Sequence, residues 1–97
     1  MIVGQTDIFK KWFRKLKDEQ AKACIANRIR SISSKDNLGD FKYVGDKIFE
    51  LRIHYGPGYR LYFCYREQTV ILLLCGGDKS TQENDIKKAG QILKLLK

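Results

Sequence analysis

The stretch IFELRIHYGPGYRLYFCYREQTVILLLC, residues 48–75, decides the fold. Apolar and polar residues alternate over residues 48–55 and again over 59–66, with the period of two that is typical of strands. Gly56-Pro57-Gly58 and Glu67-Gln68 separate the strands as tight turns. Residues 70–75 are apolar throughout, as expected of a central strand that is covered on both faces. The stretch therefore predicts three consecutive antiparallel strands.

Two helices are predicted before this stretch. Residues 1–5 form a short first strand in this interpretation. A helix follows, because Phe9, Trp12, Phe13 and Leu16 recur with helical spacing and Thr6 or Asp7 can cap its start. Asp18 can cap a second helix with an inner face of Ala21, Cys24, Ile25, Ile29 and Ile32. We expect Arg28 and Arg30 outside, and a polar loop over residues 33–45.

One more helix is predicted after the strands. Residues 76–79, which include Gly76 and Gly77, are expected to break the last strand, and Ser80 and Glu83 have the spacing of a capping box. Ile86, Ala89, Leu93 and Leu96 then mark an amphipathic helix. The order of strand, helix, helix, three antiparallel strands and helix is that of an α+β domain of two layers, which we expect to span residues 1–97 as one unit.

The charge of the chain points to an anionic partner. Nineteen Lys and Arg residues against eleven Asp and Glu give a formal net charge of +8. Nine of the basic residues lie within residues 8–35, where only Asp18 and Glu19 oppose them. A small domain of this composition commonly meets a nucleic acid or an acidic protein. No membrane-spanning segment and no signal peptide are recognisable, so we expect a cytoplasmic protein without a membrane partner.

One face of the predicted sheet collects candidate functional residues. If Phe49, Leu51 and their neighbours form the core, alternation places Arg52, His54, Arg60 and Tyr62 on the opposite side, with Lys79 at its rim. Guanidinium groups bind phosphates bidentately and aromatic rings stack on bases, so this set suits RNA. The alternative is that these are ordinary exposed strand residues, with Tyr62 in cross-strand packing. Cys24, Cys64 and Cys75 lack the spacing of a disulfide framework or a zinc site, and no metal site is predicted.

Three segments resemble the addiction-module killer proteins, the HigB-like branch of the RelE/ParE toxin superfamily. They are FKKWFRKLKD at residues 9–18, NLGD at 37–40 followed by ELRIHYGPGYRLYF at 50–63, and LLCGGDKSTQ at 73–82 followed by Asp85, Ile86 and Ala89. The resemblance covers nearly the whole chain. It implies a RelE-like fold, a small antiparallel sheet with an N-terminal helical hairpin and a C-terminal helix.

The resemblance also implies an activity and partners. RelE-like toxins of type II toxin–antitoxin modules cut messenger RNA on the ribosome with the 2′-hydroxyl of the substrate as nucleophile, without a metal or other cofactor. A cognate antitoxin, often a HigA-like helix-turn-helix protein in this branch, blocks the toxin, and the pair represses its own operator DNA. Two alternatives remain open: a ParE-like poison of DNA gyrase, and an inactive module that binds only its partner and operator.

Individual roles carry over by position. Arg60 matches the arginine placed on the scissile phosphate, and Lys79 lies where a second basic residue acts as general acid or phosphate contact. Arg52 is expected on a flanking phosphate, and His54 is a candidate base. The basic face of the first helix is expected to dock RNA through Lys10, Lys11, Arg14 and Lys15. The chain departs from the pattern at residues 83–86, which lack the tyrosine or histidine of the family, so stacking would fall to Tyr62 or Tyr59.

Overall fold

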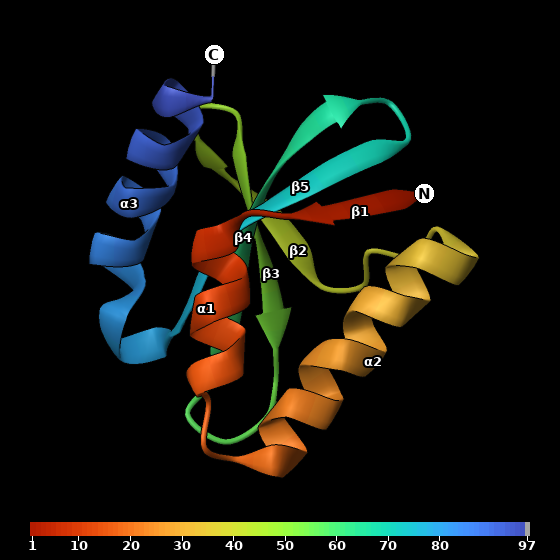
Figure 1. Ribbon diagram of the computed structural model, residues 1–97, viewed down its shortest axis with the longest axis vertical. Coiled ribbons are helices and arrows are strands. Elements are labelled where there is room, and N and C mark those ends of the chain that lie inside the picture. The colour runs from red at the N-terminus through yellow and green to blue at the C-terminus, as the bar shows by residue number, and fades with distance from the viewer. Residues whose placement is uncertain (97) are drawn as a thin grey trace.

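The fold is a five-stranded sheet with helices on both faces (Figure 1). The computed structural model describes residues 1–96. In chain order the elements are β1 (Ile2–Gln5), α1 (Asp7–Lys15), α2 (Glu19–Lys35), β2 (Phe41–Gly45), β3 (Ile48–Ile53), β4 (Tyr59–Glu67), β5 (Val70–Asp78), the short 3₁₀ helix η1 (Lys79–Thr81) and α3 (Gln82–Leu95). Within residues 1–96, no helix is both long and apolar enough to cross a membrane.

The strand order is β1-β5-β4-β3-β2. The four strands β2 to β5 pair antiparallel with their neighbours along the chain, which confirms the predicted meander. β1 pairs parallel with β5 and makes the sheet mixed at that edge. The expected α+β fold is confirmed. The expected antiparallel sheet needs one correction, since β1 is parallel to β5. The two layers that were expected are three, because α1 and α2 cover one face of the sheet and α3 covers the other.

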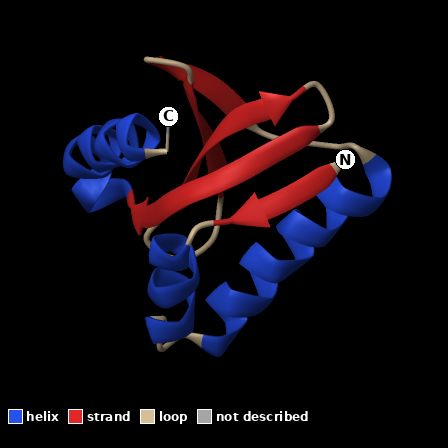
Figure 2. Ribbon diagram, turned by 45° about the horizontal axis from the view of Figure 1, so that its top comes forward, coloured by secondary structure: helices blue, strands red, loops and turns tan. Residues whose placement is uncertain are grey.

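A separate apolar core lies on each face of the sheet. Phe9 of α1 and Ile25 and Ile32 of α2 pack with Leu51, Leu61 and their neighbours on one face. Ala89, Ile92 and Leu93 of α3 pack with Tyr62 and Leu74 on the other. Figure 2 shows α1 and α2 together, with α3 apart from them. Because β5 lies between β1 and β4 with apolar residues against both layers, its apolar run is explained.

Both predicted helix starts are confirmed. Thr6 precedes α1, and its hydroxyl accepts a hydrogen bond from the amide of Phe9 at 3.0 Å. Asp18 precedes α2, and its carboxylate accepts from the amides of Gln20 and Ala21. These side chains satisfy amides that have no partner inside the first turn of a helix.

The loop predicted over residues 33–45 was wrong at both ends. α2 continues to Lys35, and residues 41–45 form the edge strand β2. Phe41 and Tyr43 of this strand pack against Phe49 of β3, with ring centroids 6.3 and 5.1 Å apart. These cross-strand aromatic contacts favour a strand although the surrounding residues are polar.

The predicted break at Gly76 and Gly77 was also wrong, because β5 continues to Asp78. A side chain at position 76 would overlap the ring of Trp12 from α1, and one at position 77 would overlap the carboxylate of Asp85 from α3. The two glycines therefore allow one helix to approach each face of the sheet. The predicted capping pair of Ser80 and Glu83 is replaced by Asp78 and Thr81 around η1.

Candidate active site

A cleft at one end of β3 and β4 brings together four of the predicted site residues. It has a volume of about 450 Å³, and its lining includes Arg52, His54, Arg60 and Lys79 together with residues 55–58 of the β3–β4 turn. The four side chains come from three segments of the chain: β3 and the residue after it, β4, and the start of η1. Three cationic side chains and an imidazole around one cleft suit a phosphate-containing ligand.

The two arginines of the cleft lie directly opposite each other on neighbouring strands. Arg52 of β3 pairs with Arg60 of β4 in the strand register. The amide of Arg52 donates to Asp40 and its carbonyl accepts from Arg28, so both backbone groups point away from β4. Arg52 and Arg60 therefore form a non-hydrogen-bonded pair, the arrangement in which facing side chains are closest.

Lys79 reaches the same cleft from the end of β5. It is the first residue of η1, directly after the strand, and it is exposed. A Cβ at Gly58 of the β3–β4 turn would lie 3.7 Å from the Cβ of Lys79, which is ordinary contact. The turn and η1 thus lie side by side at the lining of the cleft.

A buried carboxylate contacts both arginines of the cleft. It was not predicted as part of the site. Glu50 is fully buried, with an exposed fraction of 0%. Its Oε1 accepts a hydrogen bond from Nε of Arg52 at 3.2 Å, and its Oε2 lies 3.9 Å from Nε of Arg60. The sequence could have indicated this contact. Alternation puts Glu50 on the same strand face as Arg52, and a carboxylate two residues from an arginine on one face can reach it.

The prediction that Tyr62 stacks on RNA was wrong. Tyr62 is fully buried, at 0% exposure, and packs in the core under α3. Its hydroxyl donates a hydrogen bond to Oε2 of Glu50 at 3.2 Å, and burial together with the nearby carboxylate raises the pKa of Tyr62. Tyr59 is partly buried and packs edge-on against Trp12. The aromatic side chain that does line the cleft is that of Tyr55.

His54 forms a pair with Asp40 at the mouth of the cleft. Its Nε2 lies 2.6 Å from a carboxylate oxygen of Asp40, while the imidazole is 73% exposed. This hydrogen bond is the main reason that the pKa of Asp40 is lowered from its ordinary value. When Nε2 carries the proton that Asp40 accepts, the other ring nitrogen, Nδ1, is left as a proton acceptor.

Arg28 was expected outside α2, and this was wrong. Its guanidinium is partly buried and donates to the backbone carbonyls of Leu38, Asp40 and Arg52, at 3.0, 2.8 and 2.8 Å. It thereby fixes the segment that carries Asp40 beside the end of β3. Arg28 lies three residues after Ile25 and four before Ile32, so its place on the inner stripe of α2 could have been predicted. Arg30 is exposed as expected.

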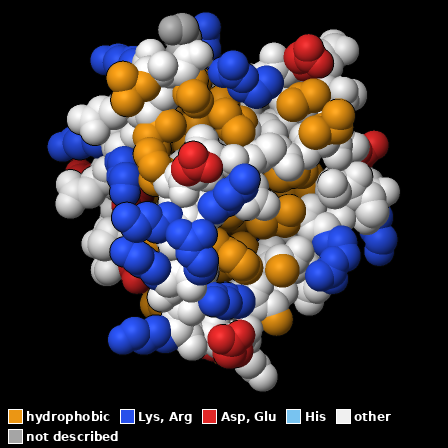
Figure 3. Space-filling model, in the orientation of Figure 1, with side chains coloured by type: hydrophobic (Ala, Val, Ile, Leu, Met, Phe, Trp, Pro, Cys, Tyr) orange, Lys and Arg blue, Asp and Glu red, His pale blue; other side chains and the backbone are white. Residues whose placement is uncertain are grey.

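The basic residues of α1 lie outside the cleft. Lys10, Lys11, Arg14 and Lys15 are all exposed, and Figure 3 shows Lys and Arg side chains gathered on the face that carries α1. A second hollow of about 360 Å³ lies between α1 and α3 and is lined by Ile8, Lys11, Trp12, Lys15 and Lys88. These residues form a basic surface separate from the arginine cleft.

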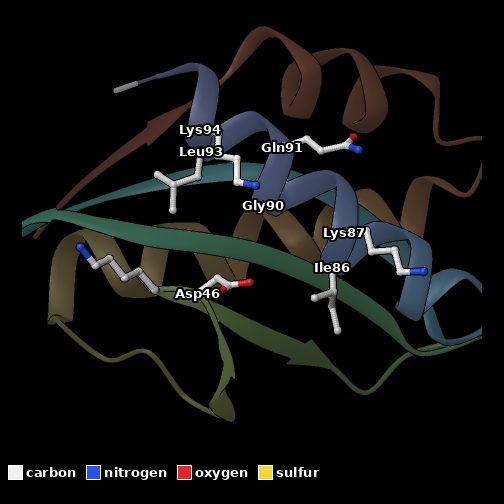
Figure 4. A pocket seen from close by; sticks show the side chains of 8 residues that line it. Asp46, Ile86, Lys87, Gly90, Gln91, Leu93 and Lys94 are labelled. Atoms are coloured by element: carbon white, nitrogen blue, oxygen red, sulfur yellow. The ribbon is translucent and has the colours of Figure 1, made fainter.

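A third hollow, of about 550 Å³, lies between α3 and the β2–β3 turn (Figure 4). Its lining includes Asp46 and Lys47 of the turn, and Lys87, Gln91 and Lys94 of α3. The turn precedes β3, whereas the arginine cleft lies at the other end of that strand. None of the predicted site residues lines this hollow.

The acidic and sulfur side chains do not form a metal site in the part of the chain that the structure describes. Among residues 1–96, no three His, Cys, Asp or Glu residues are grouped so that they could hold a metal ion. Cys64 and Cys75 are buried free thiols and Cys24 is partly buried. Burial raises the pKa of Cys75 to about 12, which keeps that thiol protonated at neutral pH.

The chain matches a known protein family and a protein of similar sequence. The family model described as "Phage derived protein Gp49-like (DUF891)" matches residues 11–97. The chain belongs to the Gp49-like family. This family is one of RelE/ParE-like toxins, so the predicted superfamily is confirmed. An uncharacterized protein of Haemophilus influenzae is 52% identical over 87 residues, which cover 90% of this chain and 87% of that protein.

The Gp49-like chain also has the fold of the E. coli toxin RelE. A double arginine-to-alanine mutant of RelE in the free state matches with a TM-score of 0.67 at 15% identity, over 94% of this chain and 96% of that one. A chain of the intact E. coli RelBE toxin–antitoxin complex matches with a TM-score of 0.64 at 16% identity, over 79% of this chain and 94% of that one. These identities are low, so the likeness concerns the fold.

Proposed function

We propose that this Gp49-like protein is the toxin of a type II toxin–antitoxin module, of the HigB-like branch, and that it cuts messenger RNA on the ribosome. The observation that carries the proposal is the single cleft lined by Arg52, His54, Arg60 and Lys79. Family membership supports the toxin class, and the cleft supports phosphodiester chemistry.

The proposed reaction uses the 2′-hydroxyl of the RNA itself. The 2′-oxygen attacks the adjacent phosphorus, a 2′,3′-cyclic phosphate forms, and the bond from phosphorus to the 5′-oxygen breaks. His54 takes the 2′-hydroxyl proton on Nδ1, because Asp40 holds its other nitrogen. Lys79 donates a proton to the leaving 5′-oxygen. This route needs no metal or other cofactor.

The arginines stabilise the charge that develops in this reaction. Arg60, whose side chain is 12% exposed, binds the non-bridging oxygens of the scissile phosphate, and Arg52 binds the same or the flanking phosphate. Donors that are fixed before the reaction stabilise the transition state without reorganisation. The basic surface of α1, with Lys10, Lys11, Arg14 and Lys15, docks on RNA of the ribosome in this proposal.

The proposed regulator is a cognate antitoxin. The fold match to a chain of the E. coli RelBE toxin–antitoxin complex supports a partner of this kind. We propose a HigA-like helix-turn-helix protein that covers the basic surface and carries the pair to operator DNA. The rate of association should then fall steeply between about 50 and about 500 mM salt, because screening shortens over that range.

Primer extension on a reporter message tests the nuclease. In a cell-free translation reaction the purified protein should introduce new cuts inside the reading frame, and these should be missing when ribosomes are left out. An intact message would contradict the nuclease. If induction in cells instead produced double-strand DNA breaks and an SOS response, the protein would be a gyrase poison. Induction without growth arrest would identify an inactive partner- and operator-binding module.

A further inference from the structure

Glu50 connects three of the segments that build the cleft. We propose that it is a positioning residue, whose buried carboxylate holds Arg52 and Arg60 side by side and leaves their terminal Nη groups available to a phosphate. The inference rests on the proposed function for the identity of the substrate. The placement of the arginines by Glu50 stands on the contacts alone.

The arginine pair requires a counter-charge. Arg52 and Arg60 face each other directly across two strands, and like charges in that position destabilise a sheet. Glu50 lies two residues before Arg52 on the same strand and therefore on the same face. Glu50 is paired across the strands with Tyr62, which lies two residues after Arg60 on β4. The Glu50–Tyr62 pair is therefore the next pair on the same sheet face as Arg52–Arg60, within reach of both arginines.

Both arginines meet the carboxylate through Nε rather than through their ends. Nε of Arg52 donates to Oε1 of Glu50 at 3.2 Å, and Nε of Arg60 lies 3.9 Å from Oε2. Within residues 1–96, the Nη atoms of these two arginines make no hydrogen bond to protein. The hydrogen bond through Nε fixes the direction of the Arg52 guanidinium, and the ion pair restrains that of Arg60. The outer edges of both are left for bidentate binding of a phosphate.

Two donors fix the carboxylate from behind. The hydroxyl of Tyr62 donates to Oε2 at 3.2 Å, and Nε2 of Gln82 donates to the same oxygen at 2.7 Å. Glu50 is therefore buried and held from β4 and α3 at once. Gln82 begins α3 and follows Lys79 by three residues, so the same carboxylate also ties down the segment that carries Lys79.

Arg60 is held less tightly than Arg52. Its Nε is buried and has no hydrogen-bond partner, so the ion pair with Glu50 at 3.9 Å is what restrains it. A guanidinium held by charge without a direct hydrogen bond can shift towards a substrate phosphate at small cost. Removal of the charge of Glu50 should thus disturb Arg60 more than Arg52.

Glu50→Gln tests the proposal, with Tyr62→Phe as matched control. The first variant removes the charge and keeps the shape. The second removes one hydrogen bond to the same carboxylate and keeps its charge. We would record thermal unfolding, the NMR signals of the Nε–H groups of Arg52 and Arg60, and kcat and KM for ribosome-dependent cleavage of a reporter message.

The positioning role predicts a specific pattern. In Glu50→Gln both Nε–H signals shift, that of Arg60 also broadens, and kcat falls on the order of 100-fold while KM stays within about threefold. Tyr62→Phe should keep both signals and lose much less kcat. A folded Glu50→Gln protein with unchanged arginine signals and unchanged kcat would overturn the proposal.

Two further arms keep the test decisive. If Glu50→Gln does not fold, Glu50→Asp replaces it, because the shorter side chain draws the charge away from both Nε atoms; the same shifts support the proposal and unchanged signals overturn it. If the wild type does not cut message, the proposed nuclease function fails by itself. The arginine signals then still decide whether Glu50 positions the pair.

Discussion

Arg52 and Arg60 face each other across β3 and β4 as a pair of like charges, with the buried carboxylate of Glu50 against the Nε atoms of both. A sheet that served only as a scaffold would gain from an apolar or oppositely charged pair at this position. The arrangement instead concentrates positive charge at the wall of a cleft. The repulsion between the two guanidinium groups is relieved when a substrate anion lies between them.

Lys79→Ala should abolish most of the activity and leave the fold intact. Lys79 is exposed on η1 and lines the cleft, so its removal takes away a proton donor or a phosphate-binding group. We expect message cleavage to fall on the order of 100-fold or more, and the free energy of unfolding to change by less than about 0.5 kcal/mol. Lys94→Ala, on the far part of α3, is the control and should cut normally. Equal cleavage by the two variants would remove Lys79 from the site.

The basic surface of α1 should govern affinity for the ribosome rather than the chemical step. Lys11 and Lys15 are exposed and line the hollow between α1 and α3. Replacing both with Gln should weaken ribosome binding and reduce the slope of log affinity against log salt by about 0.7 to 0.9 for each phosphate that the variant no longer neutralises. Lys35→Gln at the end of α2 serves as control. An unchanged salt slope in the double variant would show that α1 does not bind RNA.

Asp40→Asn should reveal a pH-dependent contribution to stability. The hydrogen bond from His54 holds the pKa of Asp40 below its ordinary value of 3.8. A lowered carboxyl pKa stabilises the fold above that ordinary value, and the contribution is lost as the pH falls through the folded-state value. Urea unfolding should show the wild type more stable than Asp40→Asn at about pH 6, with the difference gone at about pH 2. A difference that is the same at both pH values would contradict this assignment.

Gly77→Ala and Gly90→Ala should change stability in opposite directions. A Cβ at position 77 would overlap the carboxylate of Asp85, so this side chain has to leave its hydrogen bond with Thr81, and we expect a loss of about 1–3 kcal/mol. A Cβ at position 90 would lie 3.8 Å from Cδ1 of Ile48, which is ordinary contact. Because alanine is the better helix former, Gly90→Ala should gain up to about 1 kcal/mol. Chemical denaturation measures both, and a harmless Gly77→Ala would refute the close approach.

Regular patterns in the sequence predicted most of the fold. Helical spacing found α1, α2 and α3, alternation found β3 and β4 with the correct faces, and the continuous apolar run found β5. β2 was missed because its stability comes from aromatic contacts across the sheet, which a local pattern does not show. Gly76 and Gly77 were wrongly interpreted as the end of the strand. Glycine is favoured both at strand ends and where a helix packs closely on a strand, and a local pattern does not show that packing.

The candidate site was only partly predictable. Arg52, His54, Arg60 and Lys79 meet in one cleft, as alternation and the loop position suggested. Glu50 was missed and Tyr62 was misassigned, because the sheet face that was expected to be open is partly covered by α3. Once the helix covers that face, a carboxylate and a phenol on it become buried partners rather than contacts for a ligand.

Arg60 decides the central claim most directly. Message cleavage should be compared by primer extension in a cell-free translation reaction, with wild-type protein and with Arg60→Ala protein of verified fold. We predict cuts inside the reading frame with the wild type, and their reduction on the order of 100-fold or more in the variant. A folded Arg60→Ala protein that cuts at the wild-type rate, or a wild type that leaves the message intact, would contradict the proposed nuclease site.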